Sequence, residues 1–576
     1  MTQVLNSSLT LNKAILLGFF FLIFYQNPIN AQNLSNLKDA KPITISGGFN
    51  INTTVLGAKG TELNRDPFYW QFNANMNINL FGIISLPFSA TFTKENETFN
   101  QPSFNQFGMS PKYKNVTVHL GYRNMSFSNY SLSGLTFLGA GIDVVFDKIP
   151  VKISAMYGRF NKAVQFINLN DIEDEQLILE EPAYERRGFG SKISIGKQKH
   201  GVDLILFKAK DKLETLFDTI QGLKPEENIV FGINTRNTIT KKLNLNIEYT
   251  NSTYTFDTRV SDYRFETYRY INRLGTLFTP KLSTQTKNAL VSKLSYQLLK
   301  ANIALMYRRV DPEFQSMGTP GIIGDIEEYT INLSTNILNN KINFSSAIGS
   351  QRDNLNNKES QSNKRFIGSA NLNYNVNESL NFSTNYSNFN SRILPSRISF
   401  ADSVKYIQVT ENLSLTANYK FGKDSVKHSL SVVSNMQTAN TINRTLTDTL
   451  DFGTKVYNGN LNYQLNFSEQ KLSVNIAASY SKFNTDENKN SSFGPTVGAS
   501  KAFLNNKLRT NFNYSFFVTK SSNTSDYPIH NFSLALNYIL NKHHSFRFNT
   551  RYLLKPDAEL ETIHKYQANF MYNFTF

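Results

Sequence analysis

The last eleven residues of the chain, 566 to 576, constrain its fold more than any other segment. Large apolar side chains alternate there with polar or smaller ones, and the chain ends on an aromatic residue. Alternation with a period of two is typical of a β-strand whose two faces meet different surroundings. The apolar face can lie on a protein core or on lipid, and the periodicity of this one segment fits both. The apolar positions are Tyr566, Ala568, Phe570, Tyr572, Phe574 and Phe576.

The same pattern recurs along the chain, with asparagine or glutamine on the polar face. It is clearest at 72–80, 243–249, 370–376 and 457–467. Asparagine has a low propensity for strands, so its repeated use on one face needs a physical reason. A water-filled lumen supplies one, because amide side chains stay solvated inside while leucine and aromatic side chains face acyl chains. The pattern predicts an all-β fold, an antiparallel transmembrane β-barrel.

The C-terminal strand resembles the assembly signal of outer-membrane β-barrel proteins of Gram-negative envelopes. The resemblance rests on Phe570, Tyr572, Phe574 and Phe576, and the strand pattern extends over most of the chain. It implies a large porin-like barrel in the cell outer membrane, without a plug domain. It also implies three kinds of partner: membrane lipid, lipopolysaccharide and the machinery that inserts barrels.

The N-terminal residues have the features of a secretory signal peptide. Lys13 precedes an apolar run from Ala14 to Tyr25, and Ala31 offers a small residue at the expected cleavage point. The run is too short for a membrane-spanning helix. We therefore predict a signal peptide at 1–31, cleaved after Ala31, a short periplasmic segment at 32–42 and the barrel at 43–576. An uncleaved anchor is the alternative.

Composition favours an exported protein and argues against several other classes. The chain has 46 Phe, 28 Tyr and no Cys, which excludes disulfide and thiolate chemistry and a cysteine-linked lipid anchor. Its formal net charge is +16, which favours anionic neighbours such as lipopolysaccharide phosphates. The basic residues are dispersed and form no nucleic-acid-binding motif, so nucleic acid is not an expected partner.

The spacing of turn-prone segments predicts about 24 strands. Eleven short turns, such as those at Asn339-Asn340 and Asn505-Asn506, alternate with twelve longer connections. This is the arrangement of periplasmic turns and extracellular loops in a barrel. The run from Lys114 to Tyr122 leaves an alternative open, since its pairing in a hairpin would make 26 strands. A separate small N-terminal element would leave about 20 to 22.

Two polar segments are candidate binding sites. Asp171, Glu173, Asp174 and Glu175 lie in an acidic stretch whose clustered oxygens are candidate ligands for a divalent cation, although the spacing matches no EF-hand.

The second segment contains Arg259, Arg264, Arg269 and Arg273 among aromatic residues. Inside the lumen these arginines would form a constriction that attracts anions and stacks on sugars. On top of the barrel they would belong to an ordered outer loop, which is the interpretation we favour.

No catalytic or cofactor motif accompanies these candidates. The seven histidines show neither metal-ligand spacing nor a neighbouring nucleophile signature, so we expect neither an enzyme nor a cofactor. A set of serine, histidine and carboxylate from distant strands is still compatible with the sequence, because such sets are defined by geometry and not by sequence order.

Two functions fit a barrel of this size. An open lumen of 24 strands would exceed the aqueous channel of 16 to 18 strands, so something must narrow it. The candidates within the chain are the connections at 95–135, 161–186 and 258–284, and the candidate outside it is a partner protein. The barrel is accordingly predicted to be a channel for solutes or, alternatively, a non-catalytic subunit of an envelope assembly, secretion or transport complex.

The strand parity predicts which connections face the cell exterior. Cysteines introduced at Asn339 and Asn505 should not react with impermeant thiol reagents on intact cells, whereas a cysteine at Glu175 should react. The chain has no native cysteine, so the labelling has no background from the protein itself. Labelling of the Asn505 variant from outside would contradict the assignment.

Overall fold

The computed structural model describes residues 41–63, 66–94, 106–165, 182–197, 199–216, 222–357, 364–393, 405–444, 449–485, 488–522, 526–556 and 562–576. The expected signal peptide, most of the 32–42 segment and the acidic stretch with Asp171, Glu173, Asp174 and Glu175 lie outside these residues. None of the helices in the described part of the chain is long and apolar enough to cross a membrane.

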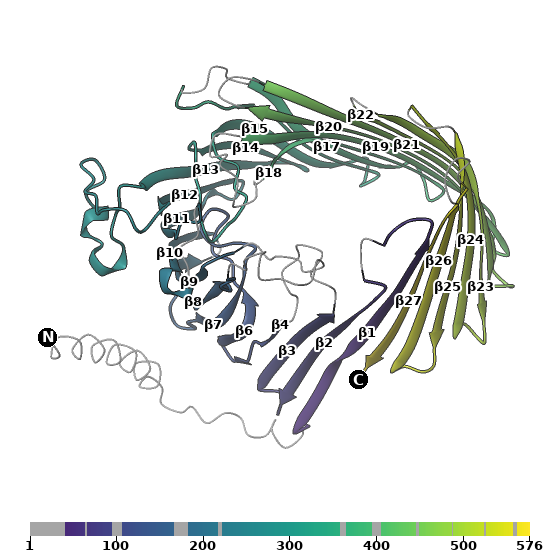
Figure 1. The fold of residues 1–576 in the computed structure, drawn as a ribbon, viewed down its shortest axis with the longest axis horizontal. Helices are drawn as coiled ribbons and strands as arrows, with labels where there is room; N and C mark the ends of the chain where they lie inside the picture. The colour runs from purple at the N-terminus through teal and green to yellow at the C-terminus, as the bar shows by residue number, and fades with distance from the viewer. Residues whose placement is uncertain are drawn as a thin grey trace.

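One antiparallel sheet closes on itself to form the wall of the molecule (Figure 1). Each strand pairs with its neighbours in chain order, and the wall is a barrel of 26 strands. The strands are β1 (Ile43–Lys59), β2 (Phe68–Leu80), β3 (Ile84–Lys94), β4 (Gln106–Met109), β5 (Lys112–Tyr113), β6 (Val116–Asn124), β7 (Thr136–Val145), β8 (Val151–Asn161), β9 (Glu185–Lys197), β10 (His200–Lys212), β11 (Glu227–Thr240), β12 (Leu243–Thr255), β13 (Thr284–Leu298), β14 (Ala301–Val310), β15 (Ile326–Ile337), β16 (Ile342–Arg352), β17 (Lys364–Asn375), β18 (Leu380–Ile393), β19 (Lys405–Lys423), β20 (Val426–Arg444), β21 (Thr449–Phe467), β22 (Leu472–Thr485), β23 (Lys489–Phe503), β24 (Leu508–Ser521), β25 (Tyr527–Ile539), β26 (His544–Lys555) and β27 (Ile563–Thr575). Short 3-10 turns lie at η2 (Leu213–Thr215), η3 (Ile271–Arg273) and η4 (Gly275–Leu277).

The labels run to β27 because one strand of the wall is interrupted. Both β4 and β5 pair with β3 on one side and with β6 on the other, so together they occupy one strand position. Ser110 and Pro111 lie at the interruption. The hairpin that includes β6 therefore confirms the alternative of 26 strands, and our leading count of about 24 was two strands too low. The connection expected at 95–135 is correspondingly shorter.

The first and last strands close the barrel. β1 pairs with β27 in one continuous register from Gly48 opposite Thr575 to Lys59 opposite His564. The chain end itself takes part, since the backbone N–H of Phe576 donates to the carbonyl of Gly47 at 3.0 Å. Closure matters because an open sheet edge in hydrocarbon would leave backbone donors and acceptors without partners.

Amide and hydroxyl side chains form hydrogen-bonded rows on one face of the wall. Across β1 to β3, Asn73 donates to Asn50 at 3.1 Å and accepts from Thr91 at 3.0 Å. In the C-terminal half, Asn460 donates to Ser479 at 2.7 Å. These side-chain pairs bridge neighbouring strands, which explains how a wall rich in asparagine is stabilised despite the low strand propensity of that residue.

The opposite face is apolar and aromatic. Phe49 lies against Phe72 and Phe574, with ring centroids 5.9 and 5.3 Å away, so that the aromatic row crosses the β1–β27 closure. On β21 and β22 the same face carries Leu461, 49% exposed, and Ile476, 54% exposed. Exposed apolar side chains in such a continuous band are the signature of a lipid-facing surface.

Asparagines terminate several strands in tight turns, as the sequence predicts. Asn339 and Asn340 between β15 and β16 have φ of 53° and 66°, and Asn505 and Asn506 between β23 and β24 have φ of 53° and 69°. Among non-glycine residues, asparagine adopts this left-handed conformation with comparatively little strain. The turn positions are thus encoded locally.

A charge on the apolar face should destabilise the barrel. We expect Leu461→Lys to cost roughly 2 to 4 kcal/mol of unfolding free energy if residue 461 lies near the bilayer midplane. The matched substitution Asn462→Lys, one position along β21 and on the polar face, should be nearly neutral. Urea unfolding of both variants in lipid vesicles measures the difference, and equal costs would contradict a membrane-facing Leu461.

Candidate lumen constriction

Two connections on the same end of the barrel meet each other over the wall. They are the inner segments 125–135, between β6 and β7, and 311–325, between β14 and β15. The backbone N–H of Ser133 donates to the carbonyl of Gly318 at 2.9 Å, and Ser316 Oγ donates to the carbonyl of Ser131 at 2.9 Å. The approach is close enough to require glycine, since a Cβ on Gly318 would lie 2.0 Å from the Ser131 carbonyl oxygen.

The inner segments pack on an apolar patch of the wall. Phe207 on β10 and Val230 on β11 are completely buried beneath them. Burial of this many large apolar side chains is the main stabilising contribution of the contact. The cluster consists of Met125, Phe127, Leu132, Phe137, Met156, Ile205, Phe207, Ala209, Val230, Tyr254 and Met317.

Glycines in the wall make room for the aromatic side chains of this cluster. A Cβ at Gly190 on β9 would lie 2.6 Å from the Phe127 ring, and one at Gly141 on β7 would lie 2.5 Å from Met125 Sδ. Both distances are too short for a real contact. The absence of side chains at these two strand positions therefore creates the surface into which segment 125–135 fits.

Polar contacts anchor the inner segments to the same strands. Asn228 of β11 is fully buried and accepts a hydrogen bond from the backbone N–H of Met317 at 3.0 Å. Ser252 of β12 donates to the carbonyl of Gln315 at 2.6 Å, and Lys192 of β9 donates to the carbonyl of Phe127 at 3.0 Å. These three backbone groups keep a hydrogen-bond partner when the segments are buried, which lowers the free-energy cost of their desolvation.

A second apolar cluster holds segment 311–325 to the wall near its own strands. Tyr130 meets Phe314 edge to face, with ring centroids 5.9 Å apart. Phe314 is completely buried, and Val310 and Ile326 pack beside it at the ends of β14 and β15. Burial also raises the pKa of the Tyr130 hydroxyl above its ordinary value. Tyr130 therefore links the two inner segments.

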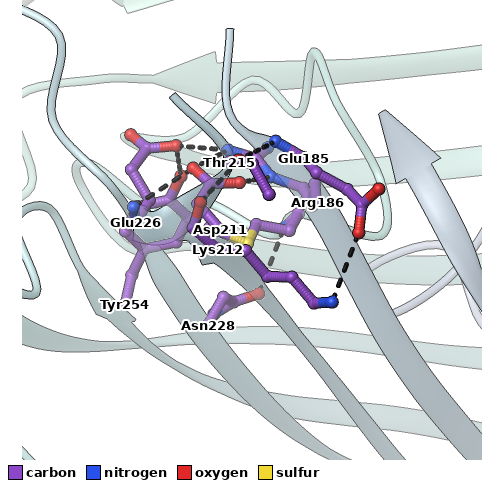
Figure 2. Close-up of polar contacts among 9 residues, drawn as sticks. Glu185, Arg186, Asp211, Lys212, Thr215, Glu226, Asn228 and Tyr254 are labelled. Atoms are coloured by element: carbon purple, nitrogen blue, oxygen red, sulfur yellow. Dashed lines mark hydrogen bonds and ion pairs between the residues drawn. The ribbon is translucent and has the colours of Figure 1, made fainter. Parts of the chain in front are cut away.

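A buried ion network ties the strand ends next to these segments (Figure 2). Arg186 of β9 makes a bidentate contact with Asp211 of β10, at 2.7 and 2.9 Å, and also donates to Glu226 at 2.8 Å. Tyr254 of β12 donates to the same Glu226 at 2.7 Å. Bidentate arginine contacts constrain direction as well as distance, so the network fixes the relative positions of β9 to β12.

A third connection, the outer segment 257–283, covers the other face of β10 to β12. Ile229 and Phe231 of β11 contact it, whereas the alternate residues Asn228 and Val230 contact the inner segments. Successive side chains of a strand point to opposite faces, so the two coverings lie on opposite sides of the wall. Figure 1 shows the β12–β13 connection outside the ring of strands, which places 125–135 and 311–325 on the lumen side.

The structure therefore gives a different outcome for each of the three segments that the sequence suggested could narrow the lumen. Residues 125–135 lie in the lumen, 258–284 does not, and 161–186 is mostly outside the described residues. Segment 311–325 was not among the candidates. Its sequence did contain a signal of burial, because large apolar side chains are not expected in a fully exposed loop. These residues are Phe314, Met317, Ile322 and Ile323.

The four arginines of the outer segment do not line the lumen. Arg259 makes a bidentate ion pair with Asp257, at 2.9 and 2.8 Å, and this pair holds the pKa of the Asp257 carboxyl below its ordinary value. Arg264, Arg269 and Arg273 are exposed on the outside. The favoured outer-loop placement is thus the one observed, and the lumen constriction is not. Their contact with anions or sugars stays a prediction.

The remaining candidates have simpler outcomes. Phe570, Tyr572 and Phe574 lie on β27 in the aromatic row, and Phe576 follows it, but their role as an insertion signal stays a prediction. No group of three or more potential metal ligands occurs among the residues that the structure describes. The acidic stretch at 171–175 is outside them.

A polar recess lies on the wall away from the inner segments. It has a volume of about 380 Å³ and is lined mainly by amides and hydroxyls of β13 to β17, including Asn302, Ser345, Asn371 and Asn373, together with Lys300. Such a lining offers hydrogen bonds in both directions and little charge, which suits a hydrated polar molecule.

Comparisons with known proteins give structural similarity only. No family model matches the chain, and no curated protein matches it. Among solved structures, the P pilus usher (PapC) translocation pore is 10% identical, covers 92% of this chain and 100% of its own, and has a TM-score of 0.41. The copper transporter OprC is 8% identical over 92% of this chain and 80% of its own, with a TM-score of 0.39. OccK8 (OprE) of Pseudomonas aeruginosa is 10% identical over 61% and 93%, with a TM-score of 0.27.

The fold itself defines the class of protein. A closed antiparallel sheet with an apolar aromatic face and an amide-rich lumen face is the architecture of outer-membrane β-barrels. The chain is a large barrel of this class, in which its own connections occupy part of the lumen.

Proposed function

We propose that the protein is a channel-like outer-membrane barrel through which polar solutes pass, and that the inner segments 125–135 and 311–325 narrow its lumen. The observation that carries the proposal is the contrast between the two parts of the wall. The lumen face of β7 to β12 is covered by these segments, whereas none of the apolar clusters formed by the described residues includes the wall from β17 to β27.

This second part of the wall is exposed on both faces. On β17, Leu372 and its neighbours Asn371 and Asn373 are all exposed, although they point to opposite sides. On β24, Phe512 and Asn511 show the same exposure. An apolar face without protein cover suits lipid, and an amide face without protein cover suits water. Together they support a water-filled passage along this side of the lumen.

Basic residues give this passage a mild preference for anions. Asn537 of β25 pairs with Arg509 of β24 and with Arg547 of β26, so the two arginines share one lumen-facing row. Arg551 lies four residues further along β26, on the same face. By contrast, Asp203 under the covered part is neutralised by Arg236 at 2.7 and 2.9 Å. The uncompensated charge of the open part is therefore positive.

The second candidate is a non-catalytic subunit of an envelope assembly, secretion or transport complex. The width of the wall favours it, because 26 strands enclose a larger space than porins of 16 to 18 strands, and the inner segments lie along one side only. A partner polypeptide would then occupy the space that we assign to water. In either role we propose contacts of the outer wall with lipid and lipopolysaccharide.

Removing an inner segment should widen the channel. We expect refolded protein in planar bilayers to show steady openings with reversal potentials of weak anion preference. Replacing 126–133 by a short Gly-Ser linker should increase the single-channel conductance severalfold, since this segment carries Phe127 and Leu132 of the constriction.

The outer segment supplies the matched control. Replacing 263–278 by the same linker removes a connection of similar kind from the opposite face of the wall, and the conductance should stay at the wild-type value. Silence of both the wild type and the 126–133 variant would contradict the channel proposal. Silence together with a stoichiometric co-purifying protein would support the envelope-complex subunit.

A further inference from the structure

A serine, a histidine and an aspartate from three neighbouring strands meet on the lumen wall, beside the inner segment 125–135. Ser110 lies at the interruption between β4 and β5, His119 on β6 and Asp143 on β7. Ser110 Oγ is 3.0 Å from His119 Nδ1, and His119 Nε2 is 3.0 Å from Asp143 Oδ2. The imidazole is therefore in contact with a hydroxyl on one side and a carboxylate on the other.

These contacts select one tautomer of the neutral imidazole. Asp143 accepts a hydrogen bond from Nε2–H, which leaves Nδ1 as an acceptor for the Ser110 hydroxyl. A base aimed at a hydroxyl and oriented by a carboxylate is the arrangement that activates a serine nucleophile. The two ring nitrogens exchange roles relative to the serine-protease arrangement, but the direction of proton transfer is the same.

The carboxylate is held firmly in this orientation. Ser154 of β8 donates to Asp143 Oδ1, and Lys152 Nζ lies 3.3 Å from the same oxygen. The second oxygen, Oδ2, then remains directed at His119. Asp143 acts in this arrangement as a positioning residue, because it contacts the histidine and not the reacting atoms.

The serine and the histidine are accessible from a recess. It has a volume of about 440 Å³ and is lined by Ser110 and His119 together with Arg123, Phe107 and Tyr122. Arg123 donates to the carbonyl of Met109, at 3.3 Å, which brings the guanidinium next to the peptide unit that precedes Ser110. The recess thus combines a nucleophile, a base and a cation.

Five of the six other histidines make different contacts. His428, His530, His544 and His564 each contact a tyrosine hydroxyl, and His543 contacts the backbone carbonyl of Thr575. Within the described part of the chain, His119 is the histidine that joins a serine hydroxyl to a carboxylate. Histidines of this wall therefore usually pair with a tyrosine hydroxyl, whereas His119 pairs with a serine and an aspartate.

We propose that Ser110, His119 and Asp143 form a hydrolytic site for carboxylic esters that have a small acyl or aryl group. Ser110 Oγ bonds to the ester carbonyl carbon while its proton moves to His119 Nδ1. The alcohol leaves with that proton, and the acyl group stays on Ser110. Water then attacks the acyl carbon, gives one proton to His119, and releases the carboxylic acid as Ser110 regains its proton. Arg123 is the nearby cation suited to the negative oxygen of each tetrahedral intermediate.

The proposal is tested on the full refolded barrel with two probes. A fluorophosphonate should modify Ser110 covalently, as mass spectrometry of the peptide that contains residue 110 would show. p-Nitrophenyl butyrate should be hydrolysed, and Ser110→Ala and His119→Gln should each lower kcat/KM at least about 100-fold. Asp143→Asn should lower kcat and change the pH profile, which a merely structural effect would not do.

Matched variants distinguish the site from nonspecific hydrolysis. Ser85→Ala removes a hydroxyl of the neighbouring β3 that donates to Asn77, and His530→Gln removes a histidine paired with Tyr514. Both should keep wild-type activity and labelling. Folding of every variant is checked by its gel mobility before and after heating. An unmodified Ser110 in the folded wild type, or hydrolysis that persists in Ser110→Ala, would overturn the proposal.

Discussion

The pairing of β1 with β27 is the constraint on which the rest of the structure depends. Strands of a membrane barrel can satisfy their backbone donors and acceptors only by pairing on both sides, so one unpaired edge would expose a whole row of them to hydrocarbon. The register from Gly48–Thr575 to Lys59–His564 removes both edges at once. It also requires residues more than 500 positions apart to meet, as Thr54 and Asn569 do at 2.8 Å. Contacts between elements so distant in sequence carry a large loop-closure entropy cost, which slows folding.

Every strand of the closed barrel has a lumen surface and an outer surface. What covers these two surfaces differs between parts of the barrel. In the C-terminal half one surface of the described strands is apolar and the other carries amide rows. Between β7 and β12 the lumen surface is covered by the inner segments, which pack on Phe207 and Val230, and on β10 to β12 the outer segment also covers the outer surface, where it packs on Ile229. The same strand period explains both arrangements, because adjacent residues of β11 serve opposite faces. The solute passage that we propose lies where the inner covering ends.

Much of this fold was predictable from local sequence. The alternation of apolar residues with asparagine predicted the strands and their two faces, and asparagine pairs such as Asn339-Asn340 predicted turns. The strand count failed at β4 to β6, where the interruption at Ser110 and Pro111 breaks the alternation and a two-residue β5 is too short to show a period.

The functional regions were less predictable for a related reason. Whether an apolar connection folds inward or outward depends on the wall residues that it meets, and these lie far away in sequence. Segment 257–283 lies outside because it packs against the outward-facing side chains of Ile229 and Phe231. Segment 125–135 lies inside because Gly141 and Gly190 leave space for its side chains. The Ser110–His119–Asp143 contacts join residues 9 and 24 positions apart across three strands, a spacing that follows only from the register of this particular sheet. The sequence alone was compatible with a set of serine, histidine and carboxylate, but it did not identify the three residues.

A disulfide across the barrel closure tests the account most directly. Thr54 and Asn569 are cross-strand partners in the β1–β27 register and the chain has no other cysteine, so the double variant Thr54→Cys, Asn569→Cys has one possible intramolecular bond. Oxidation of intact membranes should convert the chain into a loop-linked form that migrates differently on denaturing gels and reverts with reductant. A pair shifted along β27, Thr54→Cys with Lys565→Cys, should remain unlinked. Efficient linkage of the shifted pair, or none in the matched pair, would contradict the closed barrel described here.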